Sequence, residues 1–243
     1  MTVSIRVLGV IPARGGSKGI PNKNIALVSG RPLLAYTAEA ASGSRLLTRC
    51  VVSTDSPAIA GVARQLGLDV PFTRPAELAR DSTPSIPVLQ HAVRWLEENR
   101  GETFDAVMTL QPTSPLRRAG DIDGAIELLA ASSADTDSVI SFVDAGEKHP
   151  ARMKFIDADG FVAEPPFAEM FEGQPRQMLP KIYLREGSIY LTRMHVLMQQ
   201  NSLKGARCRA WIVPEERAIN IDSPFDLFLA EQMLMRSAQC QPA

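Results

Sequence analysis

The first residues able to do chemistry are three cations, Arg14, Lys18 and Lys23, which lie among glycines just after an apolar run from Ile5 to Ile11. The apolar run predicts a buried strand. Adjacent glycines allow backbone N–H groups to gather around an anion, and the cations add positive charge beside them. This pattern predicts a phosphate-binding loop, the alternative being a surface turn with unrelated cations. The loop has neither the Gly-Lys-Ser/Thr ending of a P-loop nor the Gly-x-Gly-x-x-Gly order of a dinucleotide fold.

A second polar segment follows a predicted strand over residues 69–72 and contains Arg74, Thr83 and Ser85. The two hydroxyl residues open a predicted helix that runs to about Asn99. N–H groups and the helix dipole at such an end favour anions or polar ligand edges. We also expect Thr83 to cap the helix. For Arg74 the alternative is an ordinary surface arginine.

A third polar segment begins at Gln111, directly after a predicted strand over residues 106–110. An amide side chain both donates and accepts hydrogen bonds, which suits a polyhydroxylated ligand. The alternative is a tight turn built from the prolines that follow.

The fourth candidate is the pair Asn220 and Asp222, predicted to alternate along a strand. Side chains two residues apart in a strand point the same way, so both oxygens could meet one hard cation. Structural capping by Asp222 is an equal alternative. The metal interpretation gains weight only where the phosphate-binding loop lies beside this pair.

The elements that must position these residues alternate between strand and helix. Strands are expected over residues 5–11, 50–53, 69–72, 106–110, 138–142, 188–192 and 209–213. Helices are expected over residues 33–41, 55–66, 83–99 and 121–131, with a last helix from Pro224 that Ser223 and Asp226 begin as a capping box. This alternation predicts an α/β fold with a largely parallel sheet, helices on both faces, and ligands at the carboxyl ends of the strands.

The alternation of strand and helix patterns stops between about Asp144 and Lys181, where five prolines interrupt brief apolar runs. The segment is too long and irregular for an ordinary connection, so we interpret it as a lid or an arm. The predicted organisation is a catalytic α/β domain of residues 1–143 and 186–243, with residues 144–185 as the lid or dimerisation arm.

Composition excludes several function classes. The chain has 243 residues and a formal net charge of −1, so it has no global basic field to attract nucleic acid or an anionic membrane. Its three widely spaced cysteines favour neither a disulfide framework nor a zinc site. We find no targeting segment and no apolar stretch that could span a bilayer, and expect a cytoplasmic protein.

Taken in order, the motifs IPARGGSKGIPNKN, VVSTDS, RPAELARDSTPS, LQPTSPLR and NIDSPFDL resemble the acylneuraminate cytidylyltransferases, the synthetases of CMP-sialic acid and related CMP-nonulosonates. The resemblance covers nearly the whole chain. It implies a Rossmann-like three-layer sandwich of the nucleotide-diphospho-sugar transferase type, with a small dimerisation arm. It also implies transfer of a cytidylyl group from CTP to the anomeric hydroxyl of a nonulosonic acid, with Mg²⁺ or Mn²⁺ as cofactor and a homodimer as the active form.

The resemblance also implies roles for individual residues. Catalytic roles fall to Lys18, Arg14 and Asp222, and the metal to Asp222 and Asn220. Nucleotide binding is implied for Pro12, Ala13, Arg14, Gly15, Gly16, Ser17, Lys18, Asn24, Arg74, Thr83 and Ser85. Sugar binding is implied for Gln111, Arg152, Arg176, Gln177, Arg185 and Glu186, of which Arg152, Arg176 and Gln177 match arm positions that reach a neighbouring subunit's site.

Two departures from the family pattern lie near the acceptor side. Asn220 stands where a second aspartate is common, which removes one negative charge. The segment Arg185-Glu186-Gly187 replaces the usual asparagine before the glycine, so Glu186 could supply the missing carboxylate or the pair could bind a different sugar. Two rivals stay open: a nucleotidyltransferase of the same fold with another nucleotide or a sugar phosphate, and a nucleotide-binding module without turnover.

Overall fold

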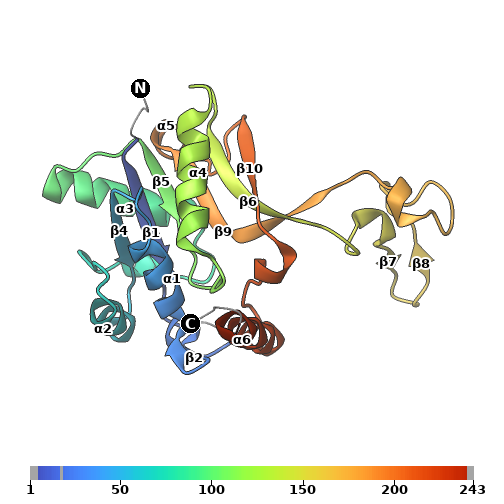
Figure 1. Cartoon of the computed structure of the whole chain (residues 1–243), viewed down its shortest axis with the longest axis horizontal. Helices are drawn as coiled ribbons and strands as arrows, with labels where there is room; N and C mark the ends of the chain where they lie inside the picture. Colours follow the sequence, from blue (N-terminus) through green and yellow to red (C-terminus); the bar gives the residue numbers. More distant parts are fainter. Residues whose placement is uncertain (1–4, 17–18, 240–243) are drawn as a thin grey trace.

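A six-stranded sheet forms the centre of the protein, in a computed structural model that describes residues 5–16 and 19–239 (Figure 1). The strand order is β10-β6-β9-β5-β1-β4. The strands are β1 (Val7–Pro12), β4 (Arg49–Ser53), β5 (Ala106–Thr109), β6 (Ser138–Asp144), β9 (Tyr183–Arg193) and β10 (Cys208–Ile212). β9 runs antiparallel to β5 and β6, and the other pairs are parallel, as the alternation of elements predicts.

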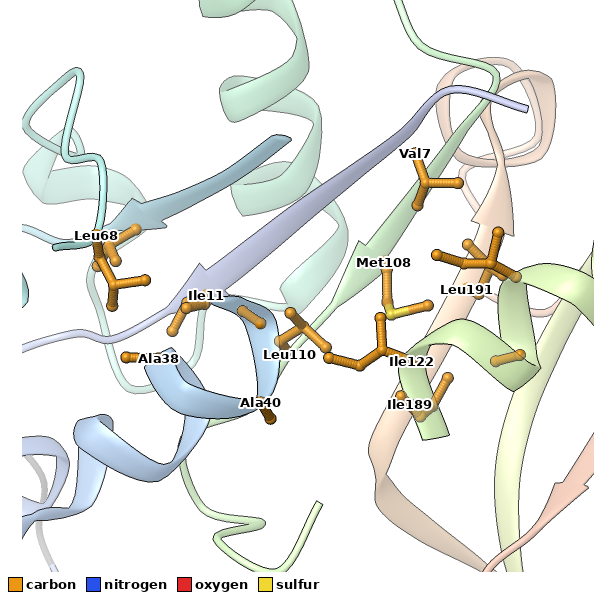
Figure 2. Close-up of a cluster of buried hydrophobic side chains, with 14 of the residues drawn as sticks. Val7, Ile11, Ala38, Ala40, Leu68, Met108, Leu110, Ile122, Ile189 and Leu191 are labelled. Atoms are coloured by element: carbon orange, nitrogen blue, oxygen red, sulfur yellow. The ribbon is translucent and has the colours of Figure 1, made fainter. Parts of the chain in front are cut away.

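Helices cover both faces of this sheet and complete a three-layer sandwich. The helices are α1 (Leu33–Ser42), α2 (Pro57–Gln65), α3 (Ser85–Arg100), α4 (Ala119–Ala131), α5 (Met194–Met198) and α6 (Pro224–Gln239). Apolar residues of α1, α2 and α4 form one core layer with the sheet, and those of α3 and α5 form the layer on the other face. Figure 2 shows Met108 and Leu110 at β5 meeting Ile122 of α4 in the first layer.

β1 lies at the centre of the parallel half of the sheet, between β4 and β5. Its residues Val7, Leu8, Val10 and Ile11 are fully buried. A strand covered by helices on both faces carries a continuous apolar run rather than an alternating one. Burial therefore fixes the strand that ends at the phosphate-binding loop.

Two predicted helix starts are confirmed. The Ser56 hydroxyl accepts from the Ile59 N–H at 3.4 Å at the start of α2, with proline next in the chain. In α6 the Asp226 carboxylate accepts from the Ser223 N–H at 2.7 Å, and the Ser223 hydroxyl accepts from the Asp226 N–H at 3.3 Å. This reciprocal pair is the expected capping box.

The predicted cap of α3 is wrong. The helix begins at Ser85, after Pro84, and has no side-chain cap. The Thr83 hydroxyl instead donates to the Glu77 carbonyl at 3.3 Å, which ties it to the short helix η2 (Ala76–Leu78). Pro84 itself is extended, with a φ of −64° and a ψ of 160°, so it stands at the N-cap position and the helix starts one residue after it.

Two strand predictions also need correction. Residues 69–72 make only an isolated bridge, Val51 to Asp69, and form no strand. β9 is longer than predicted because residues 183–185 pair with the end of β6 beyond an irregularity in the ladder. Charged residues and Gly187 in this stretch hide its strand character from a pattern based on apolar alternation.

The remaining elements are short. They are β2 (Leu27–Val28), β3 (Arg31–Pro32), η1 (Lys23–Ile25), η3 (Pro150–Arg152), β7 (Phe155–Ile156), β8 (Val162–Ala163), η4 (Arg176–Met178) and η5 (Glu215–Arg217). In the described part of the chain, no helix is long and apolar enough to cross a membrane.

The irregular segment leaves the sheet as a projecting arm. β6 ends at Asp144, β9 begins at Tyr183, and the chain between them extends away from the helices with β7 and β8 near its tip (Figure 1). Its large apolar side chains are widely exposed, including Ile156 and Phe161 at 72% and Met170 at 89%.

Helix α4 provides a paired test of packing against β10. A methyl group on Gly124 would overlap the Trp211 ring, with Cζ3 at 2.8 Å, whereas one on Gly120 would meet no atom within 4 Å. We expect Gly124→Ala to lower the free energy of unfolding by about 1–3 kcal/mol because the core becomes overpacked. Gly120→Ala should leave that free energy unchanged or raise it by up to about 1 kcal/mol. Urea denaturation measures both, and equal effects would contradict the packing of Trp211 on α4.

Candidate active site

A cavity of about 540 Å³ lies at the carboxyl ends of β1 and β5. This is where an α/β sheet is expected to hold its ligand. Nine of the predicted site residues line it: Pro12, Arg14, Asn24, Arg74, Thr83, Ser85, Gln111, Asn220 and Asp222. The cavity therefore joins the four segments that the sequence singles out, although they are as far apart as residues 12 and 222.

The phosphate-binding loop is anchored from behind by backbone and side-chain contacts. The Ala13 N–H donates to the Ser53 carbonyl at 3.0 Å, which extends the pairing of β1 with β4. The Gly15 N–H donates to Asp55 Oδ1 at 2.9 Å, and Asn24 Nδ2 donates to the Arg14 carbonyl at 3.0 Å. Asn24 is thus a residue that holds the loop as well as one that lines the cavity.

Not all predicted residues of this loop face the cavity. Ala13 is fully buried, and the N–H of Gly15 is already bonded to Asp55, so neither offers a free N–H to a ligand in this arrangement. Gly16 has a φ of 68°, a left-handed conformation that glycine adopts without strain. Ser17 and Lys18 lie outside the described residues.

Arg74 is a buried cation rather than a surface one. It is 4% exposed, its Nε donates to Ser53 Oγ at 3.0 Å, and its Nη2 donates to the Ser53 carbonyl. Burial lowers the pKa of Arg74 to about 10, with Asp55 opposing that shift and Arg14 adding to it. The guanidinium is therefore charged at neutral pH and held at one place in the cavity wall.

Two other cations of the cavity are paired with carboxylates at its rim. Arg14 Nη1 lies 2.5 Å from Asp81 Oδ1, and Lys23 Nζ lies 2.9 Å from Asp222 Oδ1. Both carboxylates are more than one third exposed, so these pairs contribute little to stability. The cations are therefore available to an anion that competes for them.

The phosphate-binding loop lies directly beside Asp222, which is the condition that the metal interpretation required. Lys23 Nζ also donates to the Ile221 carbonyl at 2.8 Å, and a Cβ on Gly19 would lie 2.8 Å from the Asp222 carbonyl. Asn220 Nδ2 donates to Asp222 Oδ2 at 2.8 Å. Residues 218–222 form a loop, however, and not the predicted strand. The two side chains meet through this hydrogen bond rather than through strand alternation.

The carboxyl end of β5 brings Gln111 against this loop. A Cβ on Gly187 would lie 2.9 Å from Gln111 Oε1 and 3.4 Å from both Ser114 Oγ and Asn220 Oδ1. Glycine is needed there because three polar side chains approach its backbone closely. Among the described residues, the buried Ser114 and Asn220 side-chain oxygens find no hydrogen-bond partner, so this side of the site keeps unused acceptors.

Arg117 fixes the backbone of the Gln111 turn. It is 5% exposed, its Nη2 donates to the Gln111 carbonyl at 2.9 Å and to Thr37 Oγ1 at 2.6 Å, and its Nη1 donates to the Ser188 carbonyl at 2.8 Å. Burial lowers the pKa of Arg117 to about 10, while Glu186 opposes that shift. A charged group thus ties α1, the Gln111 turn and β9 together.

The arm residues do not reach the cavity of their own chain. Arg176 and Gln177 line a separate cavity of about 290 Å³ at the base of the arm, and Arg152 lies 3.3 Å from Glu169. Arg185 is exposed over the Tyr190 ring. The structure therefore does not bring the predicted sugar-binding arginines to Gln111 within one subunit.

Glu186, which the sequence offers as a substitute for the missing carboxylate, lies away from Asp222. It is 5% exposed and does not line the cavity that contains Asp222. Its Oε2 accepts from the Ser188 N–H at 3.0 Å, and its Oε1 has no hydrogen-bond partner in the part of the chain that the structure describes. The Glu186 side chain therefore folds back onto the backbone of its own strand, β9.

Sequence reasoning missed several residues of the cavity, among them Arg80 and Thr113. Arg80 belongs to a motif already recognised, so its charge was a usable signal. Thr113 was not: its role depends on the hydrogen bond of 2.8 Å that its carbonyl accepts from the Ile221 N–H, a contact between distant segments.

Fold and cavity define an α/β protein that concentrates positive charge at the carboxyl ends of parallel strands. Residues 8–200 match the family model described as cytidylyltransferase. The chain therefore belongs to the cytidylyltransferase family.

Relatives with similar sequences agree with this placement. The chain is 34% identical to the post-translational flagellin modification protein B of Campylobacter coli, over 94% of each chain. It is also 34% identical to the CMP-N,N'-diacetyllegionaminic acid synthase of Legionella pneumophila, over 95% of this chain and 97% of that one. The N-acylneuraminate cytidylyltransferase of Streptococcus agalactiae serotype V is 32% identical over 89% of this chain, which corresponds to 50% of the longer relative.

Solved structures show the same fold at lower identity. A CMP:2-keto-3-deoxy-manno-octonic acid synthetase complexed with CTP superposes with a TM-score of 0.69 at 18% identity, covering 96% of this chain and 99% of that one. The 4-diphosphocytidyl-2C-methyl-D-erythritol synthase of Anaerococcus prevotii superposes with a TM-score of 0.65 at 15% identity, over 97% and 98% of the two chains.

The pair of Asp121 and Arg217 holds the segment that leads to Asn220. Arg217 Nη2 donates to Asp121 Oδ1 at 3.0 Å and Nη1 contacts Oδ2. Burial tends to raise the pKa of Asp121, but hydrogen bonds from Arg217 and from the Arg118 N–H outweigh it and hold the pKa below its ordinary value of 3.8. Its charge therefore stabilises the fold above that value, and the contribution is lost as pH falls through the lowered pKa.

We expect Asp121→Asn to lower the free energy of unfolding at pH 7 by about 3–5 kcal/mol, because it leaves the Arg217 charge without its partner. The difference from wild type should shrink as the pH falls below 3.8. Urea denaturation between pH 7 and about pH 3 measures both effects. Asp135→Asn, at an exposed pair with Arg207, is the control and should change little. Equal losses in the two variants would contradict this role of Asp121.

Proposed function

We propose that the protein transfers a cytidylyl group from CTP to the anomeric hydroxyl of a nonulosonic acid and releases pyrophosphate. The observation that carries the proposal is the cavity in which Arg14, Lys23 and Arg74 converge at the end of β1. The names of the relatives from Legionella and Streptococcus, both of which make CMP-activated nonulosonic acids by name, support the choice of nucleotide and acceptor.

Alignment and charge neutralisation account for the catalysis. The sugar hydroxyl attacks the α-phosphorus in line and gives up its proton to solvent, while the bond from that phosphorus to the β-phosphate oxygen breaks and negative charge grows on the departing pyrophosphate. Arg14 and Lys23 line the cavity where that charge develops, and Lys18 follows in the same loop sequence. Each well-placed cation stabilises such a transition state by about 3 kcal/mol. Holding the hydroxyl in line with the α-phosphorus supplies the rest.

The donor set fits a magnesium ion that arrives with the nucleotide. Within the described residues, no group of three or more acidic, histidine or cysteine side chains could hold a metal by itself. Mg²⁺ commonly takes one or two carboxylates and completes its shell with phosphates and water. Asp222 would supply one exposed carboxylate to such an ion, and the amide oxygen of the neighbouring Asn220 would supply a neutral donor. When bound, the ion would neutralise phosphate charge and act as a Lewis acid.

A homodimer is part of the proposal. The arm exposes Phe155, Ile156, Phe161 and Met170, more apolar surface than a lone projection keeps in water. Arg176 lies at the base of this arm, outside the cavity of its own subunit. A planar guanidinium binds both oxygens of a carboxylate, so Arg176 of one subunit would suit the sugar carboxylate in the other.

We also propose a cytoplasmic location. Cys50 and Cys208 are free thiols, which supports a reducing compartment. Burial raises the pKa of Cys50 to about 12, so this thiol is an inert part of the core rather than a reactive group.

The function is tested by pyrophosphate release from CTP, with Mg²⁺ and a panel of nonulosonic acids. We expect release with CTP and at least one acceptor, and little with ATP, GTP or UTP. Release with GTP only, or only with a sugar phosphate, would favour another nucleotidyltransferase of this fold. Tight CTP binding with no release from any acceptor would favour a binding module.

Mixed dimers test whether the site is shared between subunits. Asp222→Ala and Arg176→Ala should each reduce turnover strongly when all subunits carry the change, because one removes the metal carboxylate and the other the acceptor arginine. In verified mixed dimers, one of the two sites would carry neither change, so up to about one half of wild-type activity should return. Mixed dimers without any recovery would indicate that each subunit holds a complete site.

A further inference from the structure

Asp55 is an acidic residue that contacts the backbone of the phosphate-binding loop, yet it does not line the cavity. It follows β4 and precedes the Ser56 cap of α2. Its Oδ1 accepts from the Gly15 N–H at 2.9 Å, across 40 residues of sequence. A Cβ on Gly15 would lie 3.4 Å from Ser56 Cβ and 3.6 Å from Asp55 Oδ2, so the loop rests closely on this turn.

A carboxylate near a triphosphate site repels the phosphates. Its presence there therefore calls for a second role that offsets this repulsion. Asp55 acts on Arg74, whose pKa it raises against the effect of burial. Arg74 in turn donates to the Ser53 carbonyl, which also accepts from the Ala13 N–H. Asp55 is therefore connected to the loop both directly, through Gly15, and indirectly, through Arg74.

We propose that Asp55 is a positioning residue that fixes the phosphate-binding loop through the Gly15 N–H and thereby sets the place of Arg14. Arg14 is the neighbour of Gly15, and its guanidinium already bends back to the Gly16 carbonyl at 3.3 Å. A displaced Gly15 would move the Arg14 guanidinium relative to the cavity. Errors of about 1 Å in such groups can reduce turnover about 100-fold.

The hydrogen bond to Gly15 and the charge opposite Arg74 predict different results for Asp55→Asn. An asparagine keeps an oxygen acceptor at the same length but removes the charge. If the hydrogen bond to Gly15 matters, Asp55→Asn should keep kcat within about threefold of wild type, and Asp55→Ala should lower it 10- to 100-fold. If the charge opposite Arg74 is what matters, the two variants should be equally impaired. Asp55→Glu keeps the charge but moves the oxygens, so it should resemble Asp55→Ala.

The test has one readout that does not depend on activity. Amide hydrogen exchange of Gly15, followed by NMR in the full chain without nucleotide, should accelerate at least about tenfold in Asp55→Ala and stay near wild type in Asp55→Asn. Ser56→Ala removes the neighbouring helix cap while leaving Asp55 in place, and should leave Gly15 exchange and kcat near wild type. Denaturant unfolding verifies that each variant is folded. If Asp55→Ala does not fold, the comparison of Asp55→Asn with Asp55→Glu tests the positioning role instead.

The kcat comparison rests on the proposed cytidylyl transfer, whereas the hydrogen-exchange measurement does not. Unchanged Gly15 exchange in Asp55→Ala, or an Asp55→Asn enzyme as poor as Asp55→Ala, would overturn the positioning role. Loss of Gly15 protection in Ser56→Ala would also overturn it, because the effect would then belong to α2. A wild-type protein without activity would contradict the proposed function and leave the exchange result to decide on Asp55.

Discussion

The carbonyl of Ser53, at the carboxyl end of β4, is the contact on which the site depends. It accepts from the Ala13 N–H at 3.0 Å and from the buried guanidinium of Arg74. The first bond extends the β1–β4 ladder into the phosphate-binding loop, and the second seats a cation at the edge of that ladder. Because a backbone carbonyl has two lone pairs, one group can fix both elements at once. The apolar burial of β1 matters for function through this carbonyl, since the core holds the strand whose end places the loop.

Carboxylates of the protein balance the positive charge of the cavity. A chain with a net charge of −1 can therefore still contain a site for an anion. Arg14 faces Asp81, and Lys23 faces Asp222. Pairs this exposed are worth about 0–1 kcal/mol, so a triphosphate that offers several charges to the same cations displaces them at small cost. A fixed basic surface would instead attract any polyanion, including nucleic acid. Local pairs therefore favour a ligand that fits the cavity over one that is merely negative.

The sequence predicted the parts of the fold that rest on local chemistry. Buried β1, the Ser56 cap and the Ser223–Asp226 capping box each follow from residue types within a few positions, and all three are confirmed. The errors occur where distant contacts decide. Thr83 bonds Glu77 instead of capping α3, and β9 gains residues 183–185 only because β6 continues beside it. The contact between Asp55 and Gly15 could likewise not be predicted from the sequence, because the residues are 40 positions apart and no local pattern indicates that they pair.

The substitution of asparagine at position 220 is best understood through its neighbours. An aspartate there would stand beside Asp222 and place two carboxylates next to Lys23. Asparagine instead donates to Asp222 Oδ2 and keeps its own Oδ1 as an unused acceptor next to Gln111 and Gly187. Contacts within the protein thus hold the Asn220–Asp222 loop in place. In the proposed metal site the amide would still offer an oxygen, so an asparagine in place of an aspartate would weaken the attraction for a metal ion without removing a donor atom. The affinity of such a site for the metal would then depend more on the nucleotide phosphates than it would with two aspartates.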